Sequence, residues 1–263
     1  MFILSRDRLT MDLDTATLSQ MLALLDSDTR HGDGGGEATR EGGRGGAAYE
    51  RVRGKVRELC GMMQRGGHVK HLDLDRISTS YIAMETLLGL TSRKAGEWFK
   101  TELRTLGGLD HIITTMSSCA DFLDDECEEP SDLQIEKIRK IDRCMRVLEN
   151  VSYMNTENQQ YVICFKQNML ILAMTRVLGQ CQRCIESVGE HDSQASEYRA
   201  SNGAAIFDCL LSVLRVFLNI THDNEVGSIK VGQQTGLIKT LLLCVLQVPQ
   251  YVPTDKRFDL LVL

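Results

Sequence analysis

The sequence has 263 residues, of which 43% are hydrophobic and 5% aromatic, and its formal net charge is −6. This length and apolar content are enough to bury a hydrophobic core, which excludes disorder throughout, and the mostly aliphatic apolar residues suit helix packing better than a β-sandwich. The acidic balance, with a pI near 5.6, disfavours a domain that binds nucleic acid by neutralising phosphates.

The nine cysteines are odd in number and too sparse for a disulfide scaffold. Several occupy apolar positions of helical patterns, namely Cys60, Cys144, Cys209 and Cys244. They therefore indicate small buried side chains in a reducing compartment. The apolar run Met1–Leu4 is too short for a signal peptide, and no run of about 18 apolar residues predicts a membrane span. We expect an intracellular protein with no membrane contact.

In the first half of the chain, apolar residues recur at helical spacing in several segments. Leu18, Met21, Leu22 and Leu25 lie at i, i+3, i+4 and i+7, which predicts a helix that ends near Leu25. The glycine-rich stretch 31–48 predicts a flexible loop, because glycine loses more backbone entropy on folding than other residues. The further helices predicted here cover 49–63, 80–90, 95–106 and 109–123.

In the second half, charged and polar stretches separate the predicted helices. The acidic run that meets Pro130 predicts a loop over 124–132, and a second polar stretch predicts a linker loop over 187–203. Between and after these loops the apolar spacing predicts helices over 138–148, 168–185, 206–217 and 237–248.

The helices show self-similarity, which is the strongest feature of the pattern. Arg146–Ser152 aligns with Arg215–Thr221, and Glu85–Thr91 is a weaker copy with Gly89 at the asparagine position. In each copy a further apolar helix follows after a similar distance. Stacked helical units that bury their apolar faces only against neighbours form solenoids. The sequence therefore predicts an all-α fold, an irregular HEAT/armadillo-like helical repeat solenoid with inserted loops.

Asn150 and Asn219 lie near the ends of the two most similar copies, just before a polar loop. An asparagine there can bond the free carbonyls of its own helix end and adopt a left-handed turn, so we predict a capping role for both residues. Direct contact with a partner is the alternative.

Patterns that would carry catalysis or bind metal are weak in this sequence. Cys181 and Cys184 offer two zinc ligands, but no second pair lies at finger-like spacing, and a buried helix pair explains them better. His68 and His71 lack the glutamate of a zincin motif and are interpreted as loop residues. The glycine-rich stretch contains no Walker lysine. We therefore expect no metal, no cofactor, no small-molecule substrate and no enzymatic activity.

Several segments together resemble the domain shared by wings apart-like proteins. They are Ser5–Asp14, Lys70–Asp75, Ala83–Leu88, Ala95–Ile112, Leu218–Glu225, Gly236–Lys239, Cys244–Pro249 and Arg257–Asp259. Since the resemblance spans nearly the whole chain, we expect residues 1–263 to form a single helical-repeat domain, truncated at both ends. The N-terminal region of the family, with its Phe-Gly-Phe partner-binding motifs, is not in this sequence.

The resemblance implies a non-catalytic, chromatin-associated module of the nucleus, also present in the cytoplasm, that regulates cohesin release and sister chromatid cohesion. Its implied partners are cohesin subunits and cohesin's HEAT-repeat regulators. A generic armadillo-type adaptor for another intracellular protein is the alternative. Candidate partner-binding residues lie in the resembling segments: Trp98, Phe99, Asn224 and Glu225. The helical pattern around Trp98 permits either a core position or a partner-facing one.

Overall fold

The computed structural model describes residues 14–25, 43–67, 72, 74–92, 97–123, 130–189 and 201–263. These residues form twelve α-helices and two short 3₁₀ helices, and no strand occurs among them. The prediction of an all-α helical-repeat fold is confirmed.

The chain divides into two compact units, residues 1–90 and 91–263, where the sequence pattern predicts one domain. The first unit contains α2 (Thr15–Leu25), α4 (Gly43–Arg65), the 3₁₀ helix η1 (Leu74–Arg76) and α5 (Thr79–Thr91), which ends one residue past the division. This unit has a hydrophobic cluster of its own. Its buried members are Cys60, Leu72, Ile77 and Tyr81.

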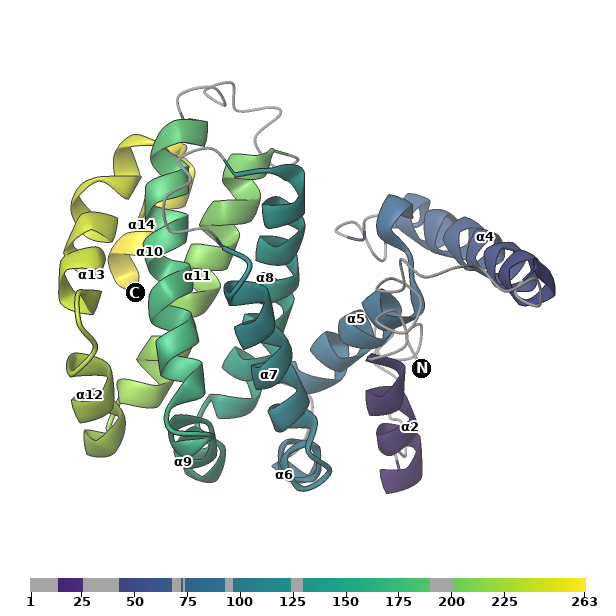
Figure 1. The fold of residues 1–263 in the computed structure, drawn as a ribbon, viewed down its shortest axis with the longest axis horizontal. Helices are drawn as coiled ribbons and strands as arrows, with labels where there is room; N and C mark the ends of the chain where they lie inside the picture. The colour runs from purple at the N-terminus through teal and green to yellow at the C-terminus, as the bar shows by residue number, and fades with distance from the viewer. Residues whose placement is uncertain are drawn as a thin grey trace. The chain divides into compact units, whose positions relative to one another are not determined.

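The second unit is a stack of helices in three rows (Figure 1). Its helices are α6 (Glu97–Thr105), α7 (Gly108–Ala120), α8 (Asp132–Ser152), α9 (Thr156–Cys164), α10 (Met169–Gly189), α11 (Asn202–Thr221), α12 (Glu225–Gly232), α13 (Leu237–Leu246), η3 (Val248–Gln250) and α14 (Thr254–Val262). The long helices α8 and α11 pack side by side, and α7, α10 and α13 form a second row. The short helices α6, α9 and α12 lie together at one end of the stack.

Helices α8 and α11 supply most of the core of this unit. In α8 the residues Ile138, Ile141, Met145 and Leu148 are buried, which is the stripe that the spacing predicts. Helix α11 is long and apolar enough to cross a membrane by length and composition alone, but 72% of that stretch is buried inside the protein. Its apolar character therefore serves packing between α8 and α10.

The sequence does not predict three of the helices, namely α9, α12 and α14. The polar loops expected after Asn150 and Asn219 contain α9 and α12. Each has only eight or nine residues. A helix this short shows little apolar periodicity, and α9 and α12 begin at asparagine caps rather than at an apolar stripe.

The bounds of the predicted loops also need correction. In 31–48, α4 already begins at Gly43, since helical hydrogen bonding extends through the strong helix formers Ala47 and Ala48. In 124–132, α8 begins at Asp132 because Ser131 caps it, accepting from the Gln134 N–H at 3.3 Å. The stretches 31–42 and 124–129 lie outside the described residues.

The linker loop 187–203 is likewise shorter than the polar composition suggests. Helix α10 continues to Gly189, with Ser187 donating back to the carbonyl of Cys184 at 3.0 Å. Helix α11 begins at Asn202, because the Ser201 hydroxyl accepts from the backbone N–H of Ala204 at 3.1 Å. The stretch 190–200 lies outside the described residues.

Candidate protein-interaction surface

The same tight turn connects α8 to α9 and α11 to α12. A left-handed residue, Met154 (φ 50°) in the first turn and Asp223 (φ 51°) in the second, precedes an asparagine. That asparagine, Asn155 or Asn224, caps the next helix by accepting from the backbone N–H three residues on, at 2.8 and 2.9 Å. The predicted partner residue Asn224 is therefore a helix cap. Glu225 follows it in the exposed first turn of α12.

Asn150 and Asn219 donate to residues far earlier in the chain instead of capping their own helices. The Asn150 Nδ2 donates to the Thr91 hydroxyl at 3.3 Å. The Asn219 Nδ2 donates to the Ser152 hydroxyl at 3.1 Å and to the Glu149 carbonyl at 2.9 Å. The predicted capping role is wrong, since the left-handed turn lies beyond each helix end and the carbonyl that Asn219 bonds belongs to the preceding repeat.

A second polar network, which sequence reasoning missed, joins α6 to α9. The Arg104 guanidinium donates to Asn158 Oδ1 at 2.6 Å and to Glu157 Oε2 at 2.5 Å. The fully buried Asn158 amide donates in turn to the carbonyls of Val151 (3.0 Å) and Lys100 (3.3 Å). Buried carbonyls need partners, so this network fixes the position of α6 against α9. No local sequence pattern signals these contacts.

The two candidate aromatic residues of α6 have opposite environments. The side chain of Phe99 is 4% exposed and belongs to the core, whereas Trp98 is 50% exposed. Their ring centroids lie 6.4 Å apart with the planes tilted by 60°. Of these two candidates, only Trp98 has an exposed aromatic ring, and Phe99 is a core residue.

The four candidate residues do not form one cluster. Trp98 and Phe99 lie on α6, and Asn224 and Glu225 lie at the start of α12. Helix α9 contacts both α6 and α12 and lies between them (Figure 1). A partner that contacts both Trp98 and Glu225 must therefore extend across the row of short helices.

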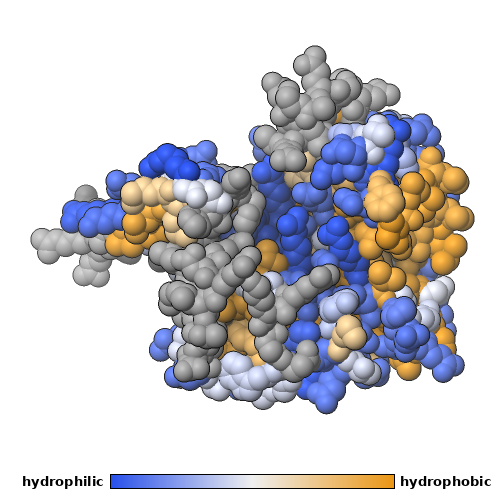
Figure 2. All heavy atoms as spheres, turned by 180° about the vertical axis from the view of Figure 1, so that it is seen from behind, coloured by the Kyte–Doolittle hydropathy of each residue, from blue (hydrophilic) through white to orange (hydrophobic). Residues whose placement is uncertain are grey.

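A large apolar face lies on α13 and α14. Figure 2 shows apolar residues gathered on the side of the molecule that carries α13. Its members, each about half exposed or more, are Ile238, Leu242, Val245, Leu246, Phe258, Leu261 and Val262. An exposed apolar surface of this kind makes α13 and α14 a candidate protein-interaction surface.

The cysteines of α10 are packing residues. Cys181 and Cys184 are fully buried, as the interpretation of a buried helix pair predicts. Among the residues that the structure describes, no three His, Cys, Asp or Glu side chains are grouped to hold a metal ion. Burial raises the pKa of the Cys144 thiol to about 12, so this thiol is protonated at neutral pH. His68 and His71 lie outside the described residues.

Known proteins match this sequence from end to end. The family model described as "Wings apart-like protein regulation of heterochromatin" matches residues 1–263. The Homo sapiens Wings apart-like protein homolog is 43% identical over 274 residues, which cover all of this chain and 22% of that relative. The Drosophila melanogaster Protein wings apart-like is 37% identical over 272 residues, all of this chain and 15% of that relative. The chain thus spans less than a quarter of the length of either relative, and over that span it belongs to the wings apart-like family.

Proposed function

We propose that this chain is a non-catalytic protein-binding module of a cohesin release factor, acting in the nucleus on chromatin. The match to the wings apart-like family over residues 1–263 carries this proposal. The family description names regulation of heterochromatin, which agrees with a chromatin-associated role. Its partners are cohesin subunits and cohesin's HEAT-repeat regulators.

The architecture of the second unit supports binding over catalysis. A solenoid offers an extended surface in which each repeat contributes a few side chains to one partner. Trp98 projects from such a surface while the neighbouring Phe99 anchors its helix in the core. Tryptophan is the residue type most enriched at the energetic centres of protein interfaces. Trp98 is therefore the residue proposed to contact a cohesin component.

Co-purification tests the proposal. The tagged chain is mixed with recombinant cohesin ring subunits and, separately, with a cohesin HEAT-repeat regulator, and the retained proteins are quantified. We expect retention of at least one of them, and a loss of about tenfold in affinity for Trp98→Ala, the scale of a central interface residue. Phe122→Ala is the matched control, since Phe122 is a comparably exposed aromatic (59%) in the turn that follows α7.

Two outcomes would contradict the proposal in different ways. If no cohesin component is retained by the unaltered, folded chain, the cohesin assignment is wrong and the adaptor alternative gains support. If cohesin is retained equally by Trp98→Ala and Phe122→Ala, the module binds cohesin through another surface.

A release assay on chromatin-bound cohesin then shows whether this chain acts alone. We expect little release, because a single binding module binds more weakly than several linked contacts, by about two to four orders of magnitude in affinity.

A further inference from the structure

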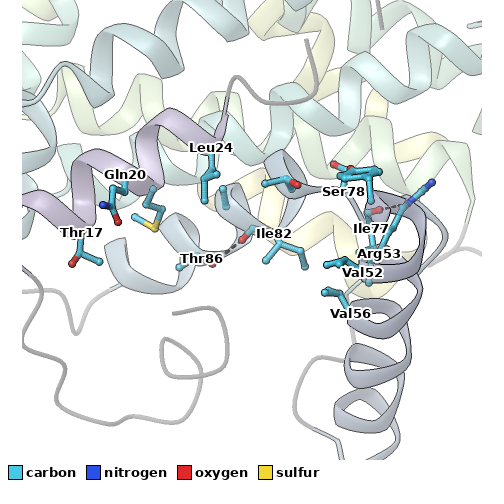
Figure 3. Close-up of a pocket in the computed structure, with 14 residues that line it drawn as sticks. Thr17, Gln20, Leu24, Val52, Arg53, Val56, Ile77, Ser78, Ile82 and Thr86 are labelled. Atoms are coloured by element: carbon cyan, nitrogen blue, oxygen red, sulfur yellow. Dashed lines mark hydrogen bonds between the residues drawn. The ribbon is translucent and has the colours of Figure 1, made fainter. Parts of the chain in front are cut away.

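The first unit contains an open groove of about 330 Å³ between α2, α4 and α5 (Figure 3). Its floor is apolar and is formed by Met21 of α2, Val56 of α4, and Ile77, Ile82 and Ala83. All of these residues belong to one compact unit. The groove is therefore a feature of that unit alone.

The rim of the groove carries apolar side chains that reach solvent. Leu24 is 46% exposed, Tyr49 is 38% exposed and Val52 is 60% exposed, and all three line the groove. In Figure 3, Leu24 projects from α2 and Val52 from α4. Exposed apolar side chains around an apolar hollow are the arrangement that receives an amphipathic helix or peptide.

Charge indicates which kind of peptide fits. Helix α4 carries six Lys and Arg residues and two Glu residues, a net charge of +4 within a chain whose net charge is −6. Arg53 brings one of these charges to the groove itself. Its Nε donates to the carbonyl of Ile77 at 2.7 Å, and its Nη1 contacts the exposed Glu50 at 3.4 Å. The guanidinium is thus held at the rim by the backbone.

We propose that this groove binds an acidic amphipathic helix of a partner protein. Apolar side chains at i, i+3 or i+4, and i+7 of that helix enter the groove, and its carboxylates face the basic surface of α4. The volume accommodates a few apolar side chains and lies at the lower end of the range of about 300–1,000 Å³ for binding pockets. This site is distinct from Trp98, and it does not depend on cohesin being the partner.

The probe for the test is a fluorescein-labelled, monomeric helical peptide of sixteen residues, with leucines along one face and glutamates elsewhere. A second peptide replaces each glutamate with lysine. Binding of both to the full chain is measured by fluorescence anisotropy at low and moderate salt. We expect saturable binding of the acidic peptide, weakened by salt, and binding of the lysine peptide that is at least about tenfold weaker.

Variants on α4 locate the site. Val52→Glu places a carboxylate on the groove rim at an exposed position, and Leu59→Glu places one at a similarly exposed position (49%) of α4 that does not line the groove. We expect Val52→Glu to weaken acidic-peptide binding by about tenfold or more and Leu59→Glu by less than about twofold. Circular dichroism of both variants checks that the helices are retained.

Several results would overturn the proposal. They are the absence of saturable binding, equal binding of the lysine peptide, or equal effects of the two variants. A concentration-dependent dimer that Val52→Glu abolishes, without peptide binding, would instead make the groove an interface between two copies. None of these results bears on retention of cohesin, so the two proposals fail separately.

Discussion

The side-chain amide of Asn219 donates to the hydroxyl of Ser152, 67 residues earlier in the chain, at 3.1 Å. Asn150 makes the corresponding contact with the Thr91 hydroxyl, 59 residues earlier, at 3.3 Å. In both cases the asparagine lies two residues before the end of its helix, and its acceptor is the last residue of an earlier helix. Within the second unit, the Asn219 contact therefore sets the register of α11 against α8.

Replacing Asn219 with Asp keeps the size of the side chain but removes the two donated hydrogen bonds. A carboxylate also faces the carbonyl oxygen of Glu149. We expect Asn219→Asp to lower the free energy of unfolding by about 1–2 kcal/mol, measured by urea denaturation. Asn202→Asp, at the exposed first residue of α11, is the control and should cost nothing, because an acidic residue is favourable at a helix N-terminus. Equal losses in both variants would contradict a register contact.

At Gly227, helix α12 lies very close to the backbone of α11. A Cβ atom at this position would lie 1.8 Å from the carbonyl oxygen of Ile220, whereas a Cβ at Gly232, in the same short helix, would meet nothing within 4 Å. We expect Gly227→Ala to destabilise the protein by at least about 2 kcal/mol and Gly232→Ala to change its stability by no more than about 1 kcal/mol. Thermal unfolding of the two variants is the measurement. Similar melting temperatures would show that the two helices are not so closely packed.

Replacing Trp98 and replacing Phe99 with alanine should have clearly different effects on the free energy of unfolding. Phe99 is buried, so Phe99→Ala is expected to cost about 3–5 kcal/mol. Trp98→Ala removes a half-exposed ring and should cost less than about 1 kcal/mol, leaving a folded protein for the binding test. Urea denaturation followed by circular dichroism gives both values. A large loss for Trp98→Ala would place its indole in the core.

Thiol reactivity reports the burial of the cysteines. Cys164 is exposed, whereas burial raises the pKa of Cys144 to about 12 from its ordinary value of 9.0. At pH 8 only about one Cys144 thiol in 10⁴ is ionised, so alkylation by iodoacetamide, mapped by mass spectrometry, should modify Cys164 far earlier. In urea the two sites should react at similar rates. Comparable rates in the folded protein would contradict the packing of α8.

The raised pKa of the Cys144 thiol also lowers the stability of the folded protein at high pH. The folded state retains the Cys144 proton between pH 9 and 12, where the unfolded chain releases it. Stability is therefore complete below pH 9 and falls as the pH rises toward 12, by the linkage between proton binding and folding. Tyr161 acts in the same direction, since burial and its hydrogen bond to Asp110 raise its pKa to about 12 from 10.0.

The long helices of the repeats were predictable because their burial is periodic. Ile138, Ile141 and Leu148 lie at helical spacing and are all fully buried. The short helix α9 was not predictable, since Thr156–Cys164 is held by an asparagine cap and by contacts from Arg104, more than fifty residues away. The bounds of the helices were also not predictable from apolar spacing, because the capping residues lie outside the apolar stripe.

The candidate surface was harder to predict than the fold. Adjacent positions on a helix differ by about 100°, so the sequence placed Trp98 and Phe99 together while packing separates them into exposed and buried residues. The asparagines at the helix ends were recognised as special, but their acceptors are non-local and no local pattern identifies them. The groove of the first unit likewise arises from three helices that are separate in sequence.

The hydrogen bonds of Asn150 and Asn219 lie at the C-terminal ends of α8 and α11. The connections that lead into these two helices lie at their N-terminal ends. A helix of about twenty residues separates the two ends by about 30 Å. The 59-residue and 67-residue separations between bonded positions show that a difference of eight residues leaves the same contact in place. Helix α10 has 21 residues where the corresponding α7 has 13, so a longer helix accounts for these eight residues and changes the length of a repeat without moving the contact at its end.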